Sequence, residues 1–285
     1  MANSHVIAGL HAAGAPPAVR KIGFRDIKES LAKGVDDFMA MPSHLAFICL
    51  IYPLVGIGLA ALTFTTNALP LLFPLASGFA LIGPLAAVGL YEVSRRRELG
   101  LEPTWQDAFE VLRSPATPSI LGLGLVLLMI LVCWLFTAQL LYEWIVGPNP
   151  PDSYARFIEE ILGTSRGWTL IIVGNAVGFI FAAIVLTIGV VSFPMLLDRH
   201  VGPSFAVETS ARAVQENPIQ IGLWGLIVAV ALVLGSLPLF VGLAVVMPVL
   251  GHATWHLYRR LVEPAPVGER REAAAVPPRP SSALA

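Results

Sequence analysis

The sequence predicts an all-α integral membrane protein with six transmembrane helices. Hydrophobic residues make up 56 % of the chain and charged residues only 13 %, whereas soluble domains carry about 25 % charged residues. Between residues 44 and 258 the chain consists mostly of apolar runs long enough to cross a bilayer, which takes about 20 helical residues. Helices are expected because unpaired backbone groups are not tolerated in hydrocarbon.

The six predicted spans follow the apolar runs and are separated by segments that hold the charges. They cover residues 44–65, 70–91, 119–142, 168–192, 219–235 and 239–258. The last two come from one apolar stretch that is too long for a single helix. Gly235 to Pro238 is a turn signal near the middle of this stretch and predicts a tight hairpin.

The distribution of basic residues predicts the orientation, since Lys and Arg are retained on the cytoplasmic side. If the N-terminus is cytoplasmic, sixteen Lys and Arg residues fall in inside segments, and only Arg156 and Arg166 fall outside. No cleavable signal precedes the first span. The sequence therefore predicts that both termini lie in the cytoplasm.

Each odd-numbered span follows a candidate cytoplasmic surface helix, at residues 26–41, 104–114 and 204–217. The first has an apolar stripe at helical spacing, formed by Ile27, Leu31, Val35, Phe38 and Met39. Prolines recur in the returning spans. This pattern favours three parallel repeats of surface helix plus helical hairpin, and the alternative is ordinary chemistry at membrane edges. The domain then covers residues 24–262, between disordered tails at 1–23 and 263–285.

The stretches 31–37 (LAKGVDD) and 238–260, which ends in GHATWHLYRR, resemble a bacterial integral membrane family catalogued as domain of unknown function 2189. The resemblance covers roughly residues 24–262. Some members of this family carry the label of cytochrome c oxidase subunit, but no activity is established for the family. The resemblance thus implies an architecture and an inner-membrane location more than a function.

His252 and His256 are the residues with the clearest possible chemistry. They lie four positions apart, so they share a helix face and could hold a metal ion, with His44 or His200 as further ligands on the same side. The competing interpretation is an interfacial anchor, because Trp255, Tyr258 and two arginines accompany them.

The membrane interior offers little other chemistry. Small residues at Gly174, Gly178 and Ala182, and at Gly56 and Ala60, predict close helix packing. Ionisable residues fall at the ends of the predicted spans, which argues against a proton-coupled carrier. No common catalytic motif is present, so an enzyme ranks last.

Two functional classes remain after these observations. A non-enzymatic accessory or assembly protein of a membrane complex is favoured, and a solute or lipid conduit without proton coupling is the alternative. The expected partners are the lipid bilayer and another membrane complex or a second copy, not nucleic acid. The sequence indicates no particular cofactor.

Overall fold

The structure, a computed structural model, is helical throughout the part of the chain that it describes. It describes Leu54, Ile57, Gly58, Ala61 and the ranges 17–40, 69–104, 106–149, 153–199, 201–238 and 240–264. Most of the first predicted span, 44–65, lies outside these residues, as do His44, His200, Gly56 and Ala60. Within the described residues the only β-pairing is an isolated bridge between Val19 and Val262.

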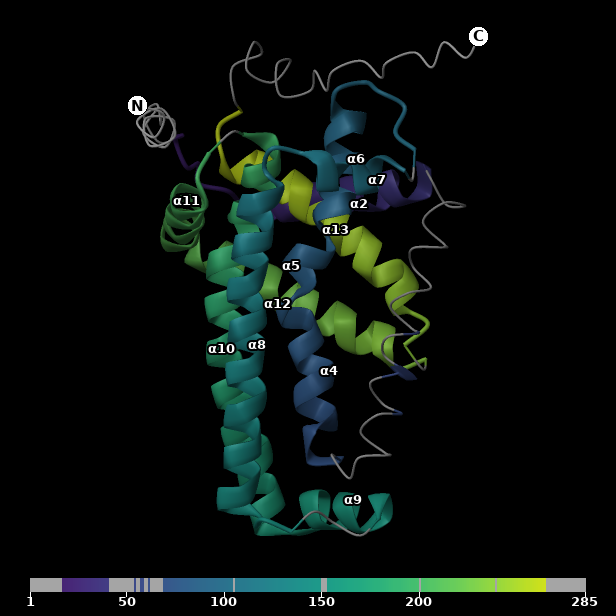
Figure 1. Ribbon diagram of the computed structural model, residues 1–285, viewed down its shortest axis with the longest axis vertical. Coiled ribbons are helices and arrows are strands. Elements are labelled where there is room, and N and C mark those ends of the chain that lie inside the picture. Colours follow the sequence, from purple (N-terminus) through teal and green to yellow (C-terminus); the bar gives the residue numbers. More distant parts are fainter. Residues whose placement is uncertain are drawn as a thin grey trace, which may run out of the picture.

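Two long antiparallel helices form one side of the molecule (Figure 1). Helix α8 covers Thr117–Ile145 and helix α10 covers Ser165–Asp198, so the predicted spans 119–142 and 168–192 both lie within helices. Their connection contains the short helix α9, Tyr154–Gly163. Thr164 caps α10 through its hydroxyl, which accepts a hydrogen bond from the amide of Gly167.

The second predicted span, 70–91, is broken into pieces. A 3-10 turn at Leu69–Leu71 (η1) leads into α4 (Leu72–Leu81), the single turn α5 (Gly83–Ala86) and α6 (Val88–Glu98). Pro84 lies in the first turn of α5, where its missing amide hydrogen costs least. The indole of Trp134 in α8 donates a hydrogen bond to the carbonyl of Pro74, 3.0 Å away, and ties α4 to α8.

The last apolar stretch forms the predicted hairpin. Helix α12 covers Pro218–Ser236 and helix α13 covers Leu243–Leu261. In the turn between them Phe240 has a positive φ of 64°, and a Cβ at Gly242 would lie 2.7 Å from the carbonyl oxygen of Gly235. In Figure 1 this hairpin is strongly inclined to α8 and α10, and its turn lies well above their lower ends.

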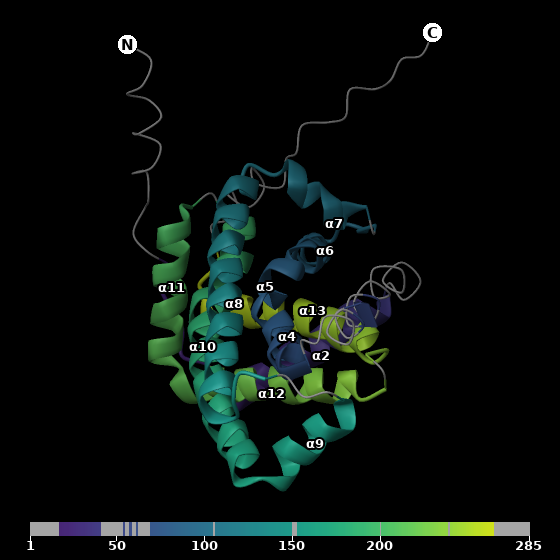
Figure 2. The same ribbon diagram turned by 60° about the horizontal axis from the view of Figure 1, so that its bottom comes forward.

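Shorter elements gather at the end of the molecule opposite α9, which we call the polar end. They are α2 (Phe24–Ala40), α7 (Asp107–Glu110), the 3-10 turn η2 (Val111–Arg113) and α11 (Pro203–Glu216), together with α6 and the C-terminal half of α13. These elements include the three predicted surface helices, with revised boundaries. Figure 2 shows α2 lying across α13, with α11 beside α10.

Residues 18–22, within the predicted N-terminal tail, lie against the end of α13 and against Asn217. The amide of Arg20 donates a hydrogen bond to the carbonyl of Leu261 at 2.7 Å, and the amide of Glu263 donates one to the carbonyl of Ala18 at 3.1 Å. The buried side chain of Asn217 accepts from the amide of Ile22 at 2.8 Å. Backbone pairing and one buried amide therefore fix residues 18–22, which have no strong apolar pattern.

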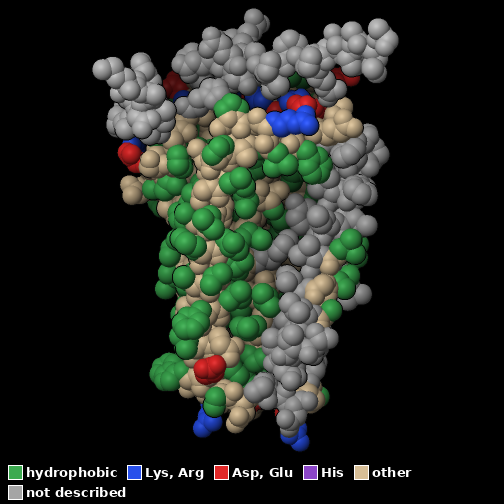
Figure 3. Space-filling view, in the orientation of Figure 1, with side chains coloured by type: hydrophobic (Ala, Val, Ile, Leu, Met, Phe, Trp, Pro, Cys, Tyr) green, Lys and Arg blue, Asp and Glu red, His purple; other side chains and the backbone are tan. Residues whose placement is uncertain are grey.

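Three of the described helices are long and apolar enough to cross a membrane, namely α8, α10 and α12. Figure 3 shows apolar side chains covering the middle of the visible face, with charged side chains at its two ends. The described structure therefore supports membrane insertion, whereas six spans and a threefold repeat remain predictions.

Candidate functional site

A buried network of polar side chains joins three helices at the polar end. Asp37 comes from α2, Ser94 and Arg97 from α6, and His252 and His256 from α13. Asp37, Ser94 and His252 are each 5 % exposed or less. Because buried polar groups need partners, the hydrogen bonds of this network determine what each group can do.

Asp37 is the centre of the network. Its Oδ2 atom accepts hydrogen bonds from the Ser94 hydroxyl at 2.6 Å and from Nε2 of His256 at 2.8 Å. Its Oδ1 atom accepts one from Arg97 at 2.8 Å. Burial raises the pKa of Asp37, but the hydrogen bonds from His256 and Ser94 outweigh it, so the pKa lies below its usual value.

Ser94 and His252 form the inner part of the network. Nδ1 of His252 lies 2.8 Å from the hydroxyl oxygen of Ser94. Since that hydroxyl donates its proton to Asp37, Nδ1 must carry the hydrogen that His252 shares with Ser94. Nε2 of His252 is buried and has no hydrogen-bond partner among the described residues.

The order of these groups differs from that of a catalytic triad. In a triad the histidine lies between the nucleophile and the carboxylate and removes the nucleophile's proton. Here Ser94 lies between His252 and Asp37 and gives its proton to the carboxylate. These hydrogen bonds therefore hold α2, α6 and α13 together. We call the group formed by Asp37, Ser94, Arg97, His252 and His256 the clasp.

Small residues bring these three helices together. A Cβ at Gly34 of α2 would lie 2.6 Å from the Cβ of Ala253, and one at Gly251 of α13 would lie 2.6 Å from Leu90 of α6. A side chain at Gly34 would separate the backbones of α2 and α13, because its Cβ would also lie 2.7 Å from backbone atoms of α13, whereas at Gly251 the side chain of Leu90 would have to move. The close approach at Gly34 thus allows Asp37 of α2 to reach His256 of α13.

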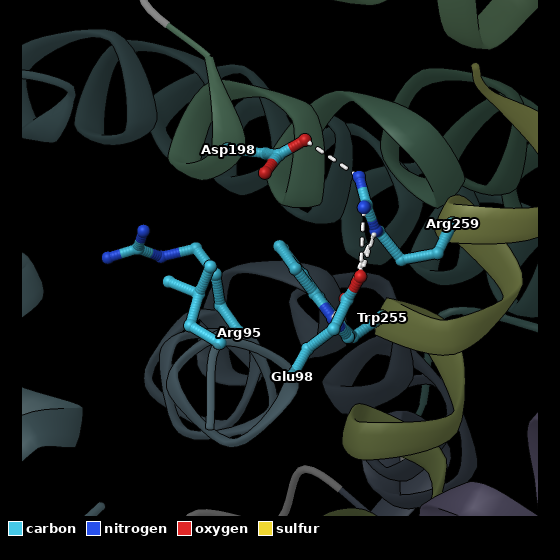
Figure 4. A pocket seen from close by; sticks show the side chains of 6 residues that line it. Arg95, Glu98, Asp198, Trp255 and Arg259 are labelled. Carbon is cyan, nitrogen blue, oxygen red and sulfur yellow. Dashed lines mark hydrogen bonds and ion pairs between the residues drawn. The ribbon is translucent and has the colours of Figure 1, made fainter. Parts of the chain in front are cut away.

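A second cluster surrounds Arg259 beside a shallow pocket (Figure 4). Arg259 donates to Glu98 at 2.8 Å and to Asp198 at 3.3 Å, and lies between the two carboxylates. The Trp255 indole also donates to Glu98, at 3.1 Å, and the Tyr258 hydroxyl donates to Asp198 at 2.7 Å. The cluster links α6, α10 and α13, so Glu98 and Asp198 mainly hold helices together.

The remaining lining residues of this pocket are Arg95 and Leu99. In Figure 4 the guanidinium group of Arg95 points away from Arg259. Arg95 is paired with Glu92 at 2.7 Å, and Arg96 joins Glu92, Asp107 and Glu110 at 2.5 to 2.7 Å. The pocket consequently offers few groups that are free to bind a ligand.

The predicted metal ligands His252 and His256 lie in the network, but each already has a protein partner. Within the described part of the chain no group of three or more His, Cys, Asp and Glu side chains is arranged to hold a metal. His44 and His200 are outside the described residues, so a site that uses them remains a prediction.

The predicted packing residues of α10 lie in different surroundings. A Cβ at Gly178 would lie 3.1 Å from the ring of Trp134 in α8, so this position faces the neighbouring helix. At Gly174 a Cβ would meet no atom within 4 Å, and Ala182 is exposed. Only one of the three therefore lies against a described helix.

Sequence reasoning did not identify Asp37, Ser94, Glu98 and Asp198 as parts of one region. Asp37 stands in the stretch LAKGVDD and Ser94 precedes three arginines, so each looks like part of a solvated segment. The available signal was the placement of these residues and both histidines on one side of the membrane. That signal does not reveal contacts between positions as far apart in sequence as Asp37 and His256.

The helical fold, the polar end and the exposed apolar side chains over the middle of the molecule, which we call the apolar belt, define an integral membrane protein. Residues 72–198 match the model of the family described as predicted integral membrane protein (DUF2189). The match confirms the resemblance seen in the sequence. It does not include the two stretches, 31–37 and 238–260, that carried it. No curated protein and no solved structure matches the chain.

Proposed function

We propose that the protein is a non-enzymatic accessory or assembly factor of a membrane complex, placed in the bacterial inner membrane with both termini in the cytoplasm. In this proposal the polar end faces the cytoplasm, in keeping with its excess of Lys and Arg. The full domain would contain six spans, with the three long apolar helices among them.

The observation that carries the proposal is a set of exposed apolar side chains beside paired charges at the polar end. Leu101, Phe109 and Leu112 are between 51 % and 66 % exposed, all within a short segment around α7 and η2. Phe109 and Leu112 are three positions apart in a helical segment and so lie on one side of it, and exposed apolar patches commonly mark protein contacts. The charged and polar side chains nearby form hydrogen bonds and ion pairs with one another, which favours a binding role over a catalytic one.

Mass spectrometry of co-purifying proteins tests this role. The tagged full chain is extracted from its native membrane in mild detergent, in parallel with the double variant Leu101→Ser, Leu112→Ser. We expect one set of membrane proteins to be enriched with the unaltered chain and lost with the variant. Leu162→Ser is the matched control, because Leu162 is 56 % exposed but lies in α9 at the opposite end. Recovery of the protein alone would contradict the proposal.

A conduit is the second candidate, and the break between α4, α5 and α6 favours it. Interrupted helices in transporters often line a substrate path. Cysteine substitutions along residues 72–98 would be labelled by a water-soluble reagent on one helical face if such a path exists. Protection of every position would exclude an aqueous conduit along this segment.

A further inference from the structure

The outward face of α2 differs from its buried face in a way that the sequence pattern did not predict. The residues that pack inward are Ile27, Ser30, Gly34 and Asp37. Val35 and Met39, which belong to the predicted apolar stripe, are 44 % and 63 % exposed, and Phe24 is 60 % exposed. The helix is therefore amphipathic with much of its apolar surface facing away from the protein.

The chain's three lysines, Lys21, Lys28 and Lys33, all lie on or just before this helix. All three are exposed, and none has an ion pair or hydrogen bond with a described residue. Lys28 lies on the same side of the helix as Phe24, Val35 and Met39, given a period of 3.6 residues, whereas Lys33 lies about 160° around the helix from Val35.

Unlike the lysines, most acidic residues of α2 form ion pairs with arginines. Asp26 and Glu29 of α2 pair with Arg260 at 3.5 and 2.6 Å, and Asp37 pairs with Arg97. These contacts neutralise most of the acidic charge of the helix internally. Asp36 is exposed and offsets one lysine, so the outward face retains a net positive charge.

Helix α2 also lies at the right level for the membrane interface. In Figure 1 it runs across the molecule near the upper ends of α8 and α10. Figure 3, in the same orientation, shows charged side chains at the upper end of the visible face, above its apolar middle. A helix that lies in the interface places apolar side chains among the acyl chains and lysines among the phosphates. Lysine is well suited to that position because its long aliphatic stem reaches back to the charged layer.

We propose that the outward face of α2 binds the anionic phospholipids of the leaflet next to the polar end. Phe24, Val35 and Met39 would contact acyl chains, while Lys28 on the same side and Lys21 just before the helix would attract the anionic headgroups. Lys33, on the far side of α2, would add only to the general positive charge of the helix. The proposal uses neither Leu101 nor Leu112, so it does not depend on the proposed accessory role.

The test measures which lipid surrounds Met39. A single cysteine is placed by Met39→Cys in a full chain that carries Cys49→Ser and Cys133→Ser, labelled with bimane and reconstituted in nanodiscs of phosphatidylcholine and phosphatidylglycerol. At equal mole fractions, either the phosphatidylglycerol or the phosphatidylcholine is brominated in turn. The ratio of the two quenching efficiencies reports the local enrichment of the anionic lipid.

We expect phosphatidylglycerol to quench several-fold more strongly than phosphatidylcholine, since each basic residue at a membrane surface contributes about a fivefold preference. Changing all three lysines to glutamine should bring the ratio close to one, whereas changing them to arginine should preserve it. High salt should reduce it by screening. All variants must match the parent in gel-filtration profile and thermal midpoint.

Two results would overturn the proposal. Equal quenching by both lipids in the parent protein would show that the face has no preference for anionic headgroups. An absence of quenching by either lipid would place Met39 away from the bilayer, against water or another protein.

Discussion

The polar end and the apolar belt use similar side chains in opposite ways. At the polar end Phe193, Trp255 and Leu261 are no more than 1 % exposed, whereas Phe136 of α8 and Phe179 of α10 are 65 % and 73 % exposed. The first group packs against protein, and the second faces the region that lipid would occupy. Lipid is as apolar as these side chains, so their exposure there costs little. Hydropathy therefore identifies the residues of the membrane region, but it does not show which apolar side chains pack against protein.

The largest expected difference between the two regions concerns tryptophan. Trp255 is 1 % exposed and Trp144, near the end of α8, is 81 % exposed. Trp255→Ala should lower the free energy of unfolding by about 4 kcal/mol, because it leaves a large cavity. Trp144→Ala should change it by less than about 0.5 kcal/mol. Unfolding in detergent micelles measures both, and similar losses would contradict the contrast.

The clasp around Asp37 should give the next largest effect. Asp37→Asn removes a charge that three donors share, and leaves at least one buried donor without a good acceptor. We expect a loss of about 3 kcal/mol in unfolding free energy. Glu143→Gln is the control, because Glu143 is an exposed carboxylate on α8 that bonds only to Gln139 in the described structure. Equal stability of the two variants would mean that the clasp contributes little.

A smaller effect is expected from the glycine at the crossing of α2 and α13. Gly34→Ala would place a Cβ 2.6 Å from that of Ala253, and such overpacking costs about 1–3 kcal/mol. Gly222→Ala adds the same methyl group to a helical glycine whose Cβ would meet no atom within 4 Å. The control should be neutral or slightly stabilising, since alanine favours helices. Thermal midpoints of the two variants in one detergent give the comparison.

The smallest predicted effect is a pH dependence of the clasp. Because the pKa of Asp37 in the folded state lies below its unfolded value of about 3.9, its ionised form stabilises the fold above that value. This contribution is lost as the pH falls through the folded-state pKa. The stability difference between the parent and Asp37→Asn should thus be steady near pH 5 and shrink below about pH 4. A stability difference that grows as the pH falls would contradict the lowered pKa of Asp37 in the folded state.

Much of the fold could be predicted from the sequence. The spans at 119–142, 168–192 and 219–235 lie within α8, α10 and α12, because long apolar runs in a membrane have few alternatives to a helix. The surface helices near residues 26, 104 and 204 are also present. The second span, 70–91, was predicted as one helix, and its division into α4, α5 and α6 near Pro84 was not predicted, because the sequence does not show how many turns a proline disrupts.

The candidate site was predicted only in part. His252 and His256 were identified from their spacing, but their partners were not, because Asp37 and Ser94 lie in other helices. The apolar stripe of α2 was predicted, but not which of its residues pack against the protein: Val35 and Met39 are exposed. An apolar stripe shows where a helix is amphipathic, yet does not show whether protein or lipid covers that stripe.

The sequence by itself determined the class of protein, the helical architecture and the positions of the long apolar helices. These follow from local quantities, namely hydropathy, run length and the placement of charges. The tertiary structure alone decided which polar groups meet at the polar end and which apolar residues are buried there. Those outcomes depend on close approaches at Gly34 and Gly251 between helices distant in sequence, which no local pattern encodes.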